Sequence, residues 1–328
     1  MRRLGTMLFW ALLLTFLVPA VCWTGLRILQ PEAGWAVRAT AFVPLAAPAY
    51  AAVIVLGLLR AAVRTRWARA GLIALVLLAC AGLGAHLSWF LPQWIGRVPD
   101  PAADAEPFRV ATLNAYAGNV PAAEIAELAD AEQVDVLVIE EITRTLLVDL
   151  DASGVLQRYP YQAGEPSETV SGTMVFSAFP IDDVAKLDTP FGSWGMSVAG
   201  PNGSLRLYGV HPRPPVGSAA GWRHDLAAIR AAVSDADLVA GDFNATPDQQ
   251  PMLALRESGL RSAAELANAG WSPTWPANGM VHLAGVTLPR LVQIDHVLVG
   301  ERLTVVEVSR RSMTGSDHDA VIAEVAAR

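Results

Sequence analysis

The feature that most constrains this chain is a set of three long apolar stretches among its first hundred residues. They cover roughly Met7–Leu29, Ala39–Leu59 and Ala70–Ile95. At a rise of about 1.5 Å per residue, a helix over each stretch is long enough to cross a hydrocarbon core about 30 Å thick. The sequence therefore predicts a membrane domain over residues 1–96 that contains three transmembrane helices. The alternative, a soluble all-helical domain, is disfavoured by the positive mean hydropathy of the chain and by the near absence of acidic residues here.

The arginines on either side of these stretches predict their orientation. Four arginines lie in the connection Arg60–Arg69 and two at the N-terminus, whereas the connection Gln30–Arg38 is nearly bare of them. Positive charge is retained in the cytoplasm. We therefore expect a multi-pass protein of the cell membrane, with everything after the third span on the extracytoplasmic side. A cleaved signal peptide is the alternative for the first stretch, because Arg2 and Arg3 precede its apolar residues.

Charge divides the chain in two. Nine arginines and one acidic residue, Glu32, precede Pro99, which leaves 15 basic and 30 acidic residues and a formal charge of −15 for the rest. Such a charge repels polyanions on average and disfavours long duplex DNA as a partner. Both cysteines, Cys22 and Cys80, fall in the apolar stretches, so a disulfide framework or a cysteine-based zinc site is excluded after Pro99.

Residues 97–107 are polar and rich in proline, which predicts a linker. The remaining residues, 108–328, are enough for one domain with a substantial core. Helical spacing occurs at Pro121–Glu132, Trp222–Val233 and Gln250–Glu257. Strand-like runs occur at Phe108–Leu113, Val134–Ile139, Thr173–Phe176, Ser204–Val210, Leu238–Ala240, Ile294–Val299, Thr304–Val308 and Ala320–Val325. This alternation predicts an α+β fold with two sheets packed face to face and helices outside.

Two short acidic motifs follow or precede strand-like runs in the second half of this domain. They are Gly241-Asp242-Phe243-Asn244 and Ser316-Asp317-His318. A carboxylate can relay a proton or bind a metal ion, and an amide can hold a phosphate oxygen without ionising. Together they indicate part of a hydrolytic metal site.

Four further polar residues lie at the end of, or inside, apolar runs. They are Asn114, Glu141, His211 and Asp295. Each alone is more often a turn or surface residue than a functional one, because single-residue signals of this kind are weak. Their order along the chain, together with the two motifs, makes the set informative.

In that order the residues resemble the endonuclease/exonuclease/phosphatase superfamily of metal-dependent phosphoesterases, over about Phe108 to Val325. Ser177–Ile181 and Thr274-Trp275-Pro276 are similar to further landmarks of the family. The resemblance implies a four-layered α/β sandwich, formed by two packed mixed sheets flanked by helices, with the site at the strand ends. The membrane spans before it are similar to those of a membrane-anchored bacterial subgroup.

The resemblance also implies a role for each residue. Glu141, Asn114 and Asp317 would bind Mg²⁺ or Mn²⁺, since oxygen ligands suit hard cations. His318 would accept a proton from the attacking water, with its tautomer fixed by Asp317 or Asp295. Asp242 would orient the water or protonate the leaving oxygen. Asn244 would fix the scissile phosphate, and His211 would stabilise charge on the phosphoryl oxygens.

The chain departs from the family's pattern at three positions. Glu140 stands where glutamine is common, so an extra acid either tightens metal binding or faces solvent. Asp319 and Ala178 stand where arginines are frequent. We also expect His224 and Asp225, on the helix at Trp222–Val233, to be surface residues.

Three functions remain compatible with the sequence. The first is a membrane-anchored, metal-dependent phosphoesterase whose substrate is a small or lipid-borne phosphodiester or phosphomonoester. The second is a metal-dependent endonuclease or exonuclease, in which arginines such as Arg213 and Arg223 supply a local basic patch. The third is a catalytically silent binding module anchored in the membrane. The complete set of site residues favours an enzyme, and its partners are then a phosphate ester and, through the three helices, a lipid bilayer.

Overall fold

The computed structural model describes residues 2–62 and 65–328. The chain divides into two compact units, Met1–Pro92 and Gln93–Arg328. Two of the arginines from which the orientation was predicted are not fully described. Arg64 and the side chain of Arg2 lie outside the described part of the chain.

The N-terminal unit is helical. It contains α1 (Arg2–Leu29), α2 (Gly34–Thr40), α3 (Ala46–Ala62) and α4 (Arg66–Phe90). Three helical segments in the described residues are long and apolar enough to cross a membrane, namely Arg3–Leu29, Val43–Ala62 and Arg66–Gln93. These agree with the three stretches predicted from the sequence, and α2 is an additional short helix that the sequence did not predict.

Small residues allow α3 and α4 to pack closely. A Cβ placed on Gly82 would lie 2.5 Å from the ring of Tyr50, and one on Gly57 would lie 2.6 Å from Val76. Thr24 of α1 joins the same contact through hydrogen bonds to the Tyr50 hydroxyl, at 2.8 Å, and to His86. Polar side chains within an apolar bundle are stable only when paired in this way.

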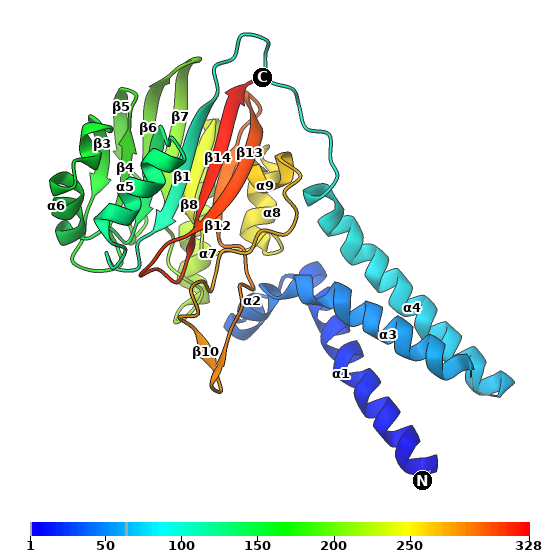
Figure 1. Ribbon diagram of the computed structural model, residues 1–328. Coiled ribbons are helices and arrows are strands. Elements are labelled where there is room, and N and C mark those ends of the chain that lie inside the picture. The colour runs from blue at the N-terminus through cyan, green and yellow to red at the C-terminus, as the bar shows by residue number, and fades with distance from the viewer. Residues whose placement is uncertain (1, 63–64) are drawn as a thin grey trace. The chain divides into compact units, whose positions relative to one another are not determined.

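The second unit is built on two six-stranded sheets (Figure 1). The first has the strand order β13-β14-β1-β2-β4-β3 and the second β5-β6-β7-β8-β12-β9. The strands of the first sheet are β1 (Phe108–Asn114), β2 (Val136–Glu140), β3 (Tyr161–Glu165), β4 (Thr173–Ser177), β13 (Leu303–Ser312) and β14 (Asp319–Ala327). Those of the second are β5 (Ile181–Lys186), β6 (Trp194–Gly200), β7 (Gly203–Val210), β8 (Leu238–Asp242), β9 (Arg261–Ser262) and β12 (Asp295–Val299).

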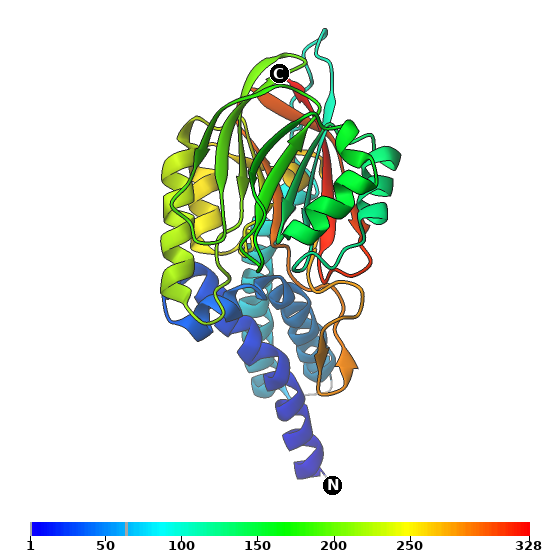
Figure 2. The same cartoon turned by 90° about the vertical axis from the view of Figure 1, so that its left-hand side faces the viewer.

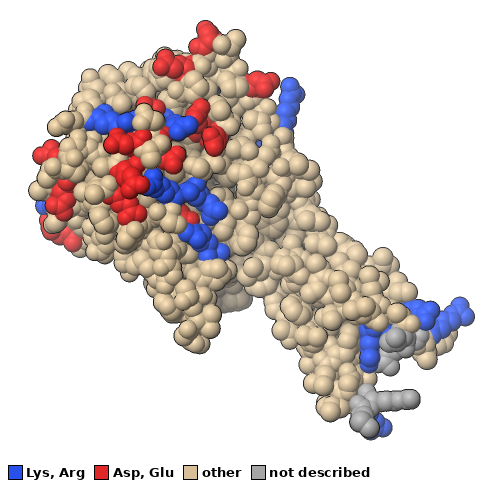
Figure 3. All heavy atoms as spheres, in the orientation of Figure 1, with Lys and Arg blue, Asp and Glu red and all other residues tan. Residues whose placement is uncertain are grey.

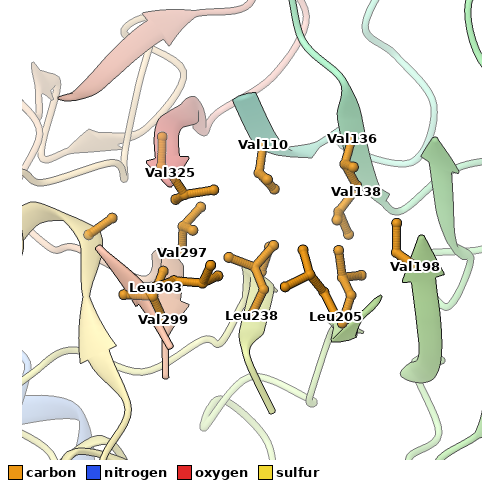
Figure 4. Close-up of a cluster of buried hydrophobic side chains, with 14 of the residues drawn as sticks. Val110, Val136, Val138, Val198, Leu205, Leu238, Val297, Val299, Leu303 and Val325 are labelled. Carbon is orange, nitrogen blue, oxygen red and sulfur yellow. The ribbon is translucent and has the colours of Figure 1, made fainter. Parts of the chain in front are cut away.

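The core lies between the two sheets. Side chains from both inner faces meet there, including Val110, Val138 and Val325 from the first sheet and Leu238 and Val297 from the second (Figure 4). All five are 6 % exposed or less. Alternating residues of paired strands face each other across such a sandwich, which explains why these runs are rich in valine and leucine.

Helices cover the two outer faces. They are α5 (Ala122–Ala131) and α6 (Arg144–Ala152) on the first sheet, and α7 (Ala219–Ala232), α8 (Gln250–Glu257) and α9 (Ala263–Leu266) on the side of the second (Figure 2). The predicted four-layered sandwich of two mixed sheets flanked by helices is thus confirmed. The sequence did not predict α6, β3, β5 or β6. The last five residues of β5 are all exposed, so it lacks the apolar run that marks a buried strand.

Residues 97–107, predicted to be a linker, contain no helix or strand, but this segment and the residues just before it are bonded to the second unit. Gln93 O accepts a hydrogen bond from Gly270 N at 2.7 Å, and Ala102 N donates to Ala327 O at 2.9 Å. Between them, the Thr304 hydroxyl donates to Pro99 O at 2.6 Å. This segment is therefore part of the second unit rather than a free tether.

Candidate active site

The strand topology brings the predicted site residues to one edge of the sandwich. The parallel pairing of β1 with β2 places Asn114 opposite Glu140, at the carboxyl ends of both strands. The antiparallel pairing of β8 with β12 places Asp242 opposite Asp295. β14 runs antiparallel to β1 and begins at Asp319, so His318 enters at the same edge.

Asn114 links the two sheets at this edge. Its side-chain nitrogen donates to Asp242 Oδ2 at 3.0 Å and to Glu141 Oε1 at 3.3 Å. The other oxygen of Glu141 accepts a hydrogen bond from the Ala117 backbone at 2.7 Å. Glu141 is a non-glycine residue with a φ of 55°, a conformation that turns its side chain away from the strand direction at a modest cost.

His318 is held by Asp295. Its Nδ1 lies 3.0 Å from Asp295 Oδ2 and 3.1 Å from Oδ1, and all of these atoms are buried. Its Nε2 faces the opposite way, 4.0 Å from Asp242 Oδ2 and 3.8 Å from Asp317 Oδ1. The sequence left open whether Asp295 or Asp317 orients this ring, and it is the Asp295 carboxylate that lies within hydrogen-bond distance of Nδ1.

His211 and Asn244 lie on the other side of Asp242. His211 Nε2 is 3.7 Å from Asp242 Oδ2, and the His211 ring packs edge-on against Phe191. Asn244 donates from its side chain to Asp242 Oδ2 at 3.3 Å and to Pro212 O at 3.1 Å. Like Glu141, Asn244 adopts a positive φ, of 48°, which asparagine tolerates better than most residues.

The Asp317 side chain is held by Trp275. Its Oδ2 accepts a hydrogen bond from Trp275 Nε1 at 2.8 Å, whereas its buried Oδ1 has no hydrogen-bond partner among the described residues. A buried carboxylate oxygen without a donor is costly unless a ligand satisfies it. All eight predicted site residues thus belong to one connected network: Asn114, Glu141, His211, Asp242, Asn244, Asp295, Asp317 and His318.

Burial and crowding of charge shift the pKa values of this network. Burial lowers the pKa of His318, but the carboxylates of Asp295 and Asp242 outweigh that effect and raise it to about 10. Burial and the charge of Asp295 raise the pKa of Asp242 to about 7. Burial lowers the pKa of His211 to about 3, so this imidazole is neutral at physiological pH. Burial also raises the pKa of Glu141. A site with so many perturbed groups is typical of catalysis.

The residues present fit a divalent cation. Carboxylate and amide oxygens from Glu141, Asn114 and Asp317 are hard ligands, and the unsatisfied Asp317 Oδ1 is one of them. One ligand atom from each of Asp242, Asp295 and His318 also lies within 4.8 Å of the others. Both groups contain ligand atoms that already accept hydrogen bonds, Asp295 beside His318 Nδ1 and Glu141 from Asn114 and Ala117. Asp317 Oδ1 is the buried ligand atom that lacks such a bond among the described residues.

Two of the three departures from the family pattern, Glu140 and Asp319, are buried in the structure. Glu140 does not face solvent, because it is fully buried and accepts a hydrogen bond from the Thr112 hydroxyl at 2.8 Å. Its burial raises the pKa of its carboxyl well above the usual range. Asp319 is also buried and pairs with Arg290 and Arg310.

The expectation that Asp225 lies on the surface is wrong. Its side chain is fully buried and accepts two hydrogen bonds from Arg213, at 2.7 and 2.8 Å, whereas His224 is exposed as expected. A guanidinium fork matches a carboxylate so closely that it makes burial of the acid tolerable. Arg213 is therefore committed to an internal ion pair.

Two supporting residues had no assigned role in the sequence. Ser316 donates to Asn114 O at 2.7 Å and accepts from His318 N at 3.0 Å, which joins β1 to the start of β14. Trp275, from the Thr274-Trp275-Pro276 landmark, donates a hydrogen bond from its indole to Asp317. The serine in Ser-Asp-His was a usable signal, because serine commonly bonds to a backbone amide two residues on.

A comparison with protein-family models matches residues 111–318 to the endonuclease/exonuclease/phosphatase family. The chain belongs to this family. The match covers every residue of the network described above and confirms the resemblance seen in the sequence. Members of the endonuclease/exonuclease/phosphatase family are metal-dependent phosphoric ester hydrolases, so the prediction of that enzyme class is confirmed at the level of the family.

Solved structures share the fold. A family member from Beutenbergia cavernae is 20 % identical over 67 % of this chain and 72 % of its own, with a TM-score of 0.51. TDP2 from D. rerio, complexed with a single-stranded DNA product, is 15 % identical over 67 % of this chain and 99 % of its own, with a TM-score of 0.54. The 3′ phosphatase NExo from Neisseria, bound to a DNA hairpin, is 18 % identical over 66 % and 98 %, with a TM-score of 0.52. A comparison with curated proteins finds no match.

Proposed function

We propose that this protein is a membrane-anchored, divalent-metal-dependent phosphoesterase that hydrolyses a small or lipid-borne phosphodiester or phosphomonoester. The single observation that carries the proposal is the His318–Asp295 pair, in which Nδ1 is held at 3.0 Å and Nε2 is directed toward Asp242 and Asp317. Once deprotonated, an imidazole oriented in this way can accept a proton from water at Nε2.

Mg²⁺ or Mn²⁺ would be held by Glu141, Asn114 and Asp317. When bound, the cation supplies positive charge beside the negative charge that develops in phosphoryl transfer. That positive charge also favours deprotonation of the acidic groups around it, including the His318 imidazolium.

The remaining residues have roles that follow from their contacts. His318 accepts the proton of the attacking water at Nε2, while Asp295 stabilises the resulting imidazolium. Asp242, with a pKa near 7, is able to exchange a proton with water or the leaving oxygen. The neutral His211 and the amide of Asn244 flank Asp242 and can donate hydrogen bonds to phosphoryl oxygens.

Charge supports the substrate class. A nuclease that acts on long duplex DNA usually presents lysines and arginines along its surface, and each neutralises a phosphate. Here the residues after Pro99 carry one lysine, Lys186, and a formal charge of −15. Acidic and basic side chains intermingle on the face of the second unit seen in Figure 3, and several arginines lie beside acids. Arg213, a candidate for a DNA-binding patch, is paired with Asp225.

A metal-dependent endonuclease or exonuclease is the second candidate. It is favoured by the similar structures, since TDP2 and NExo are both bound to DNA. A catalytically silent binding module is the third, and it would be expected to have lost a member of the network.

A substrate panel tests these three functions. The full chain, purified in lipid nanodiscs, is offered plasmid DNA, phospholipids, inositol phosphates and a chromogenic phosphodiester at equal Mg²⁺ and low salt. We expect turnover of small or lipid-borne esters that stops in excess chelator. Plasmid nicking without turnover of the others would replace the proposal by the second candidate, and inactivity on every substrate would support the third.

Two variants link activity to the site. We expect Glu141→Ala and His318→Ala each to lower kcat by at least about 10²-fold, the lower end for losing a general base. His224→Ala, which changes an exposed histidine on α7, is the control for the second variant. A Glu141→Ala protein that matches the wild type would contradict the assigned metal site.

The proposed location is the cell membrane, with the catalytic unit on the extracytoplasmic side. It is supported by the arginines of the Arg60–Arg69 connection and by three helices able to span a bilayer. An alkaline phosphatase fused after Arg328 is expected to be active, because that reporter folds only outside the cytoplasm. A fusion that is inactive, beside an active cytoplasmic reporter at the same position, would indicate an even number of spans.

A further inference from the structure

A small β-hairpin protrudes from the catalytic unit beside the site. It consists of β10 (His282–Leu283) and β11 (Val286–Thr287), which pair only with each other (Figures 1 and 2). The turn Ala284-Gly285 has positive φ at both positions, 48° and 80°, as a tight two-residue hairpin turn requires. Leu288 N also bonds to Val281 O at 2.9 Å, so the hairpin has a defined shape.

The tip of the hairpin is apolar and exposed. Leu283 is 67 % exposed, Val286 65 % and Met280 40 %. No lysine, arginine, aspartate or glutamate occurs from Asn278 to Pro289. The protruding hairpin accordingly carries no blue or red atoms in Figure 3, which colours lysine, arginine, aspartate and glutamate. Exposed apolar groups gathered on a projection mark a contact surface rather than a core.

Both arms of the hairpin are bonded to the catalytic segment around His318. On the first arm, Ala277 N donates to Asp317 O at 2.7 Å, and the Asn278 side chain donates to Ser316 O at 2.9 Å. On the second arm, the Arg290 guanidinium pairs with Asp319. Whatever the tip contacts is therefore held at a fixed separation from the catalytic histidine.

We infer that this hairpin, residues 278–290, is a lipid-contacting element that sets the active site on the surface of a bilayer. The occupant is a phospholipid bilayer because the same chain carries three helices able to span one, and because residues 93–102 are bonded to the catalytic unit and leave no long free tether. A tip that presents leucine, valine and methionine, and no lysine, arginine, aspartate or glutamate, can enter the headgroup region without burying a charge of any of those four residue types. The inference rests on the proposed function and deepens it, since it selects lipid-borne esters as the substrates.

Fluorescence tests the contact without reference to activity. The full chain with Cys22→Ser and Cys80→Ser is given a single cysteine by Val286→Cys, labelled with an environment-sensitive dye and placed in nanodiscs of phosphatidylcholine and phosphatidylglycerol. Val148→Cys on α6 is the matched control, because Val148 is 66 % exposed. We expect spin-labelled lipids to quench the dye at residue 286 at least about threefold more than the dye at residue 148. Equal quenching at the two positions, or capture of residue 286 by a second copy of the chain in crosslinking, would overturn the inference.

Kinetics separate this inference from the proposed function. A double variant, Leu283→Ser with Val286→Ser, is expected to slow turnover of a phospholipid in the nanodisc at least about tenfold and to leave hydrolysis of a water-soluble phosphodiester within about twofold. Val148→Ser serves as the control. Equal loss on both substrates would show that the hairpin only supports the fold. Quenching without turnover of any lipid would retain the lipid contact and discard lipid-borne esters as substrates.

Discussion

Replacing Asp295 by asparagine should change the tautomer of His318 while the shape of the site stays nearly the same. The two side chains have nearly the same volume, but an amide can donate to Nδ1, which would leave the proton on Nε2. The ring then cannot accept a proton from water. The wild-type contact is 3.0 Å long and fully buried, and two unit charges at that distance attract by about 5 kcal/mol at an effective dielectric constant of about 20.

Most of that attraction is absent from the variant, so the pKa of His318 should fall well below about 10. We expect kcat to fall by about 10²- to 10⁴-fold, equivalent to about 3 to 5 kcal/mol of transition-state stabilisation. The assay is metal-dependent hydrolysis of a chromogenic phosphodiester, accompanied by nitrogen-15 NMR of the histidine tautomers. Both readouts are needed, because a merely unfolded variant would also lose activity.

Asp237→Asn is the control for this variant. Asp237 is buried beside the first residue of β8 and pairs with Arg302, at the end of the strand far from Asp242. Its replacement should cost stability and leave kcat of the folded fraction unchanged. An Asp295→Asn protein with kcat within about threefold of the wild type, or with an unchanged His318 pKa, would refute the proposed role of the pair.

Three further predictions concern protons and packing. Metal binding should release protons at pH 8, because a cation displaces the proton of His318, whose pKa is raised to about 10, and calorimetry in buffers of different ionisation enthalpy measures this. Glu140→Gln should become progressively more stable than the wild type as pH rises above about 4.5, because the raised pKa of Glu140 makes the folded wild type lose stability over that range; urea unfolding at several pH values checks the slope. Gly241→Ala should lose about 2 to 4 kcal/mol in the same assay, because a Cβ there would lie 1.9 Å from Val210 O and φ is 155°.

The sequence was sufficient to predict the sheets' central strands and the residues at their ends. β1, β2, β8 and β14 are buried along almost their whole length, so their apolar runs stand out. Each polar residue at the end of such a run was a weak signal by itself. Their order along the chain, which resembles that of the family, made all eight candidate site residues recognisable before their distances were known.

Other features depend on tertiary contacts that no local pattern encodes. β5 has an exposed face and an irregular register between Asp182 and Ala185, so it lacks a strand-like sequence. Asp225 has the appearance of a surface acid on a helix, and only the approach of Arg213 from a different segment allows its burial. The choice of Asp295 over Asp317 as the partner of His318 Nδ1 likewise depends on the pairing of β8 with β12.

The first and last strands of the catalytic unit are neighbours, since Phe108 pairs with Val325 and Thr112 with Val321. During synthesis, the edge of β1 that pairs with β14 therefore stays unpaired until the final residues of β14 have been made. Contacts between such distant segments form slowly, and the sandwich cannot close from its N-terminal end alone. If the catalytic unit lies on the extracytoplasmic side, as proposed, this order favours export, because the sandwich cannot close before its last strand has been made.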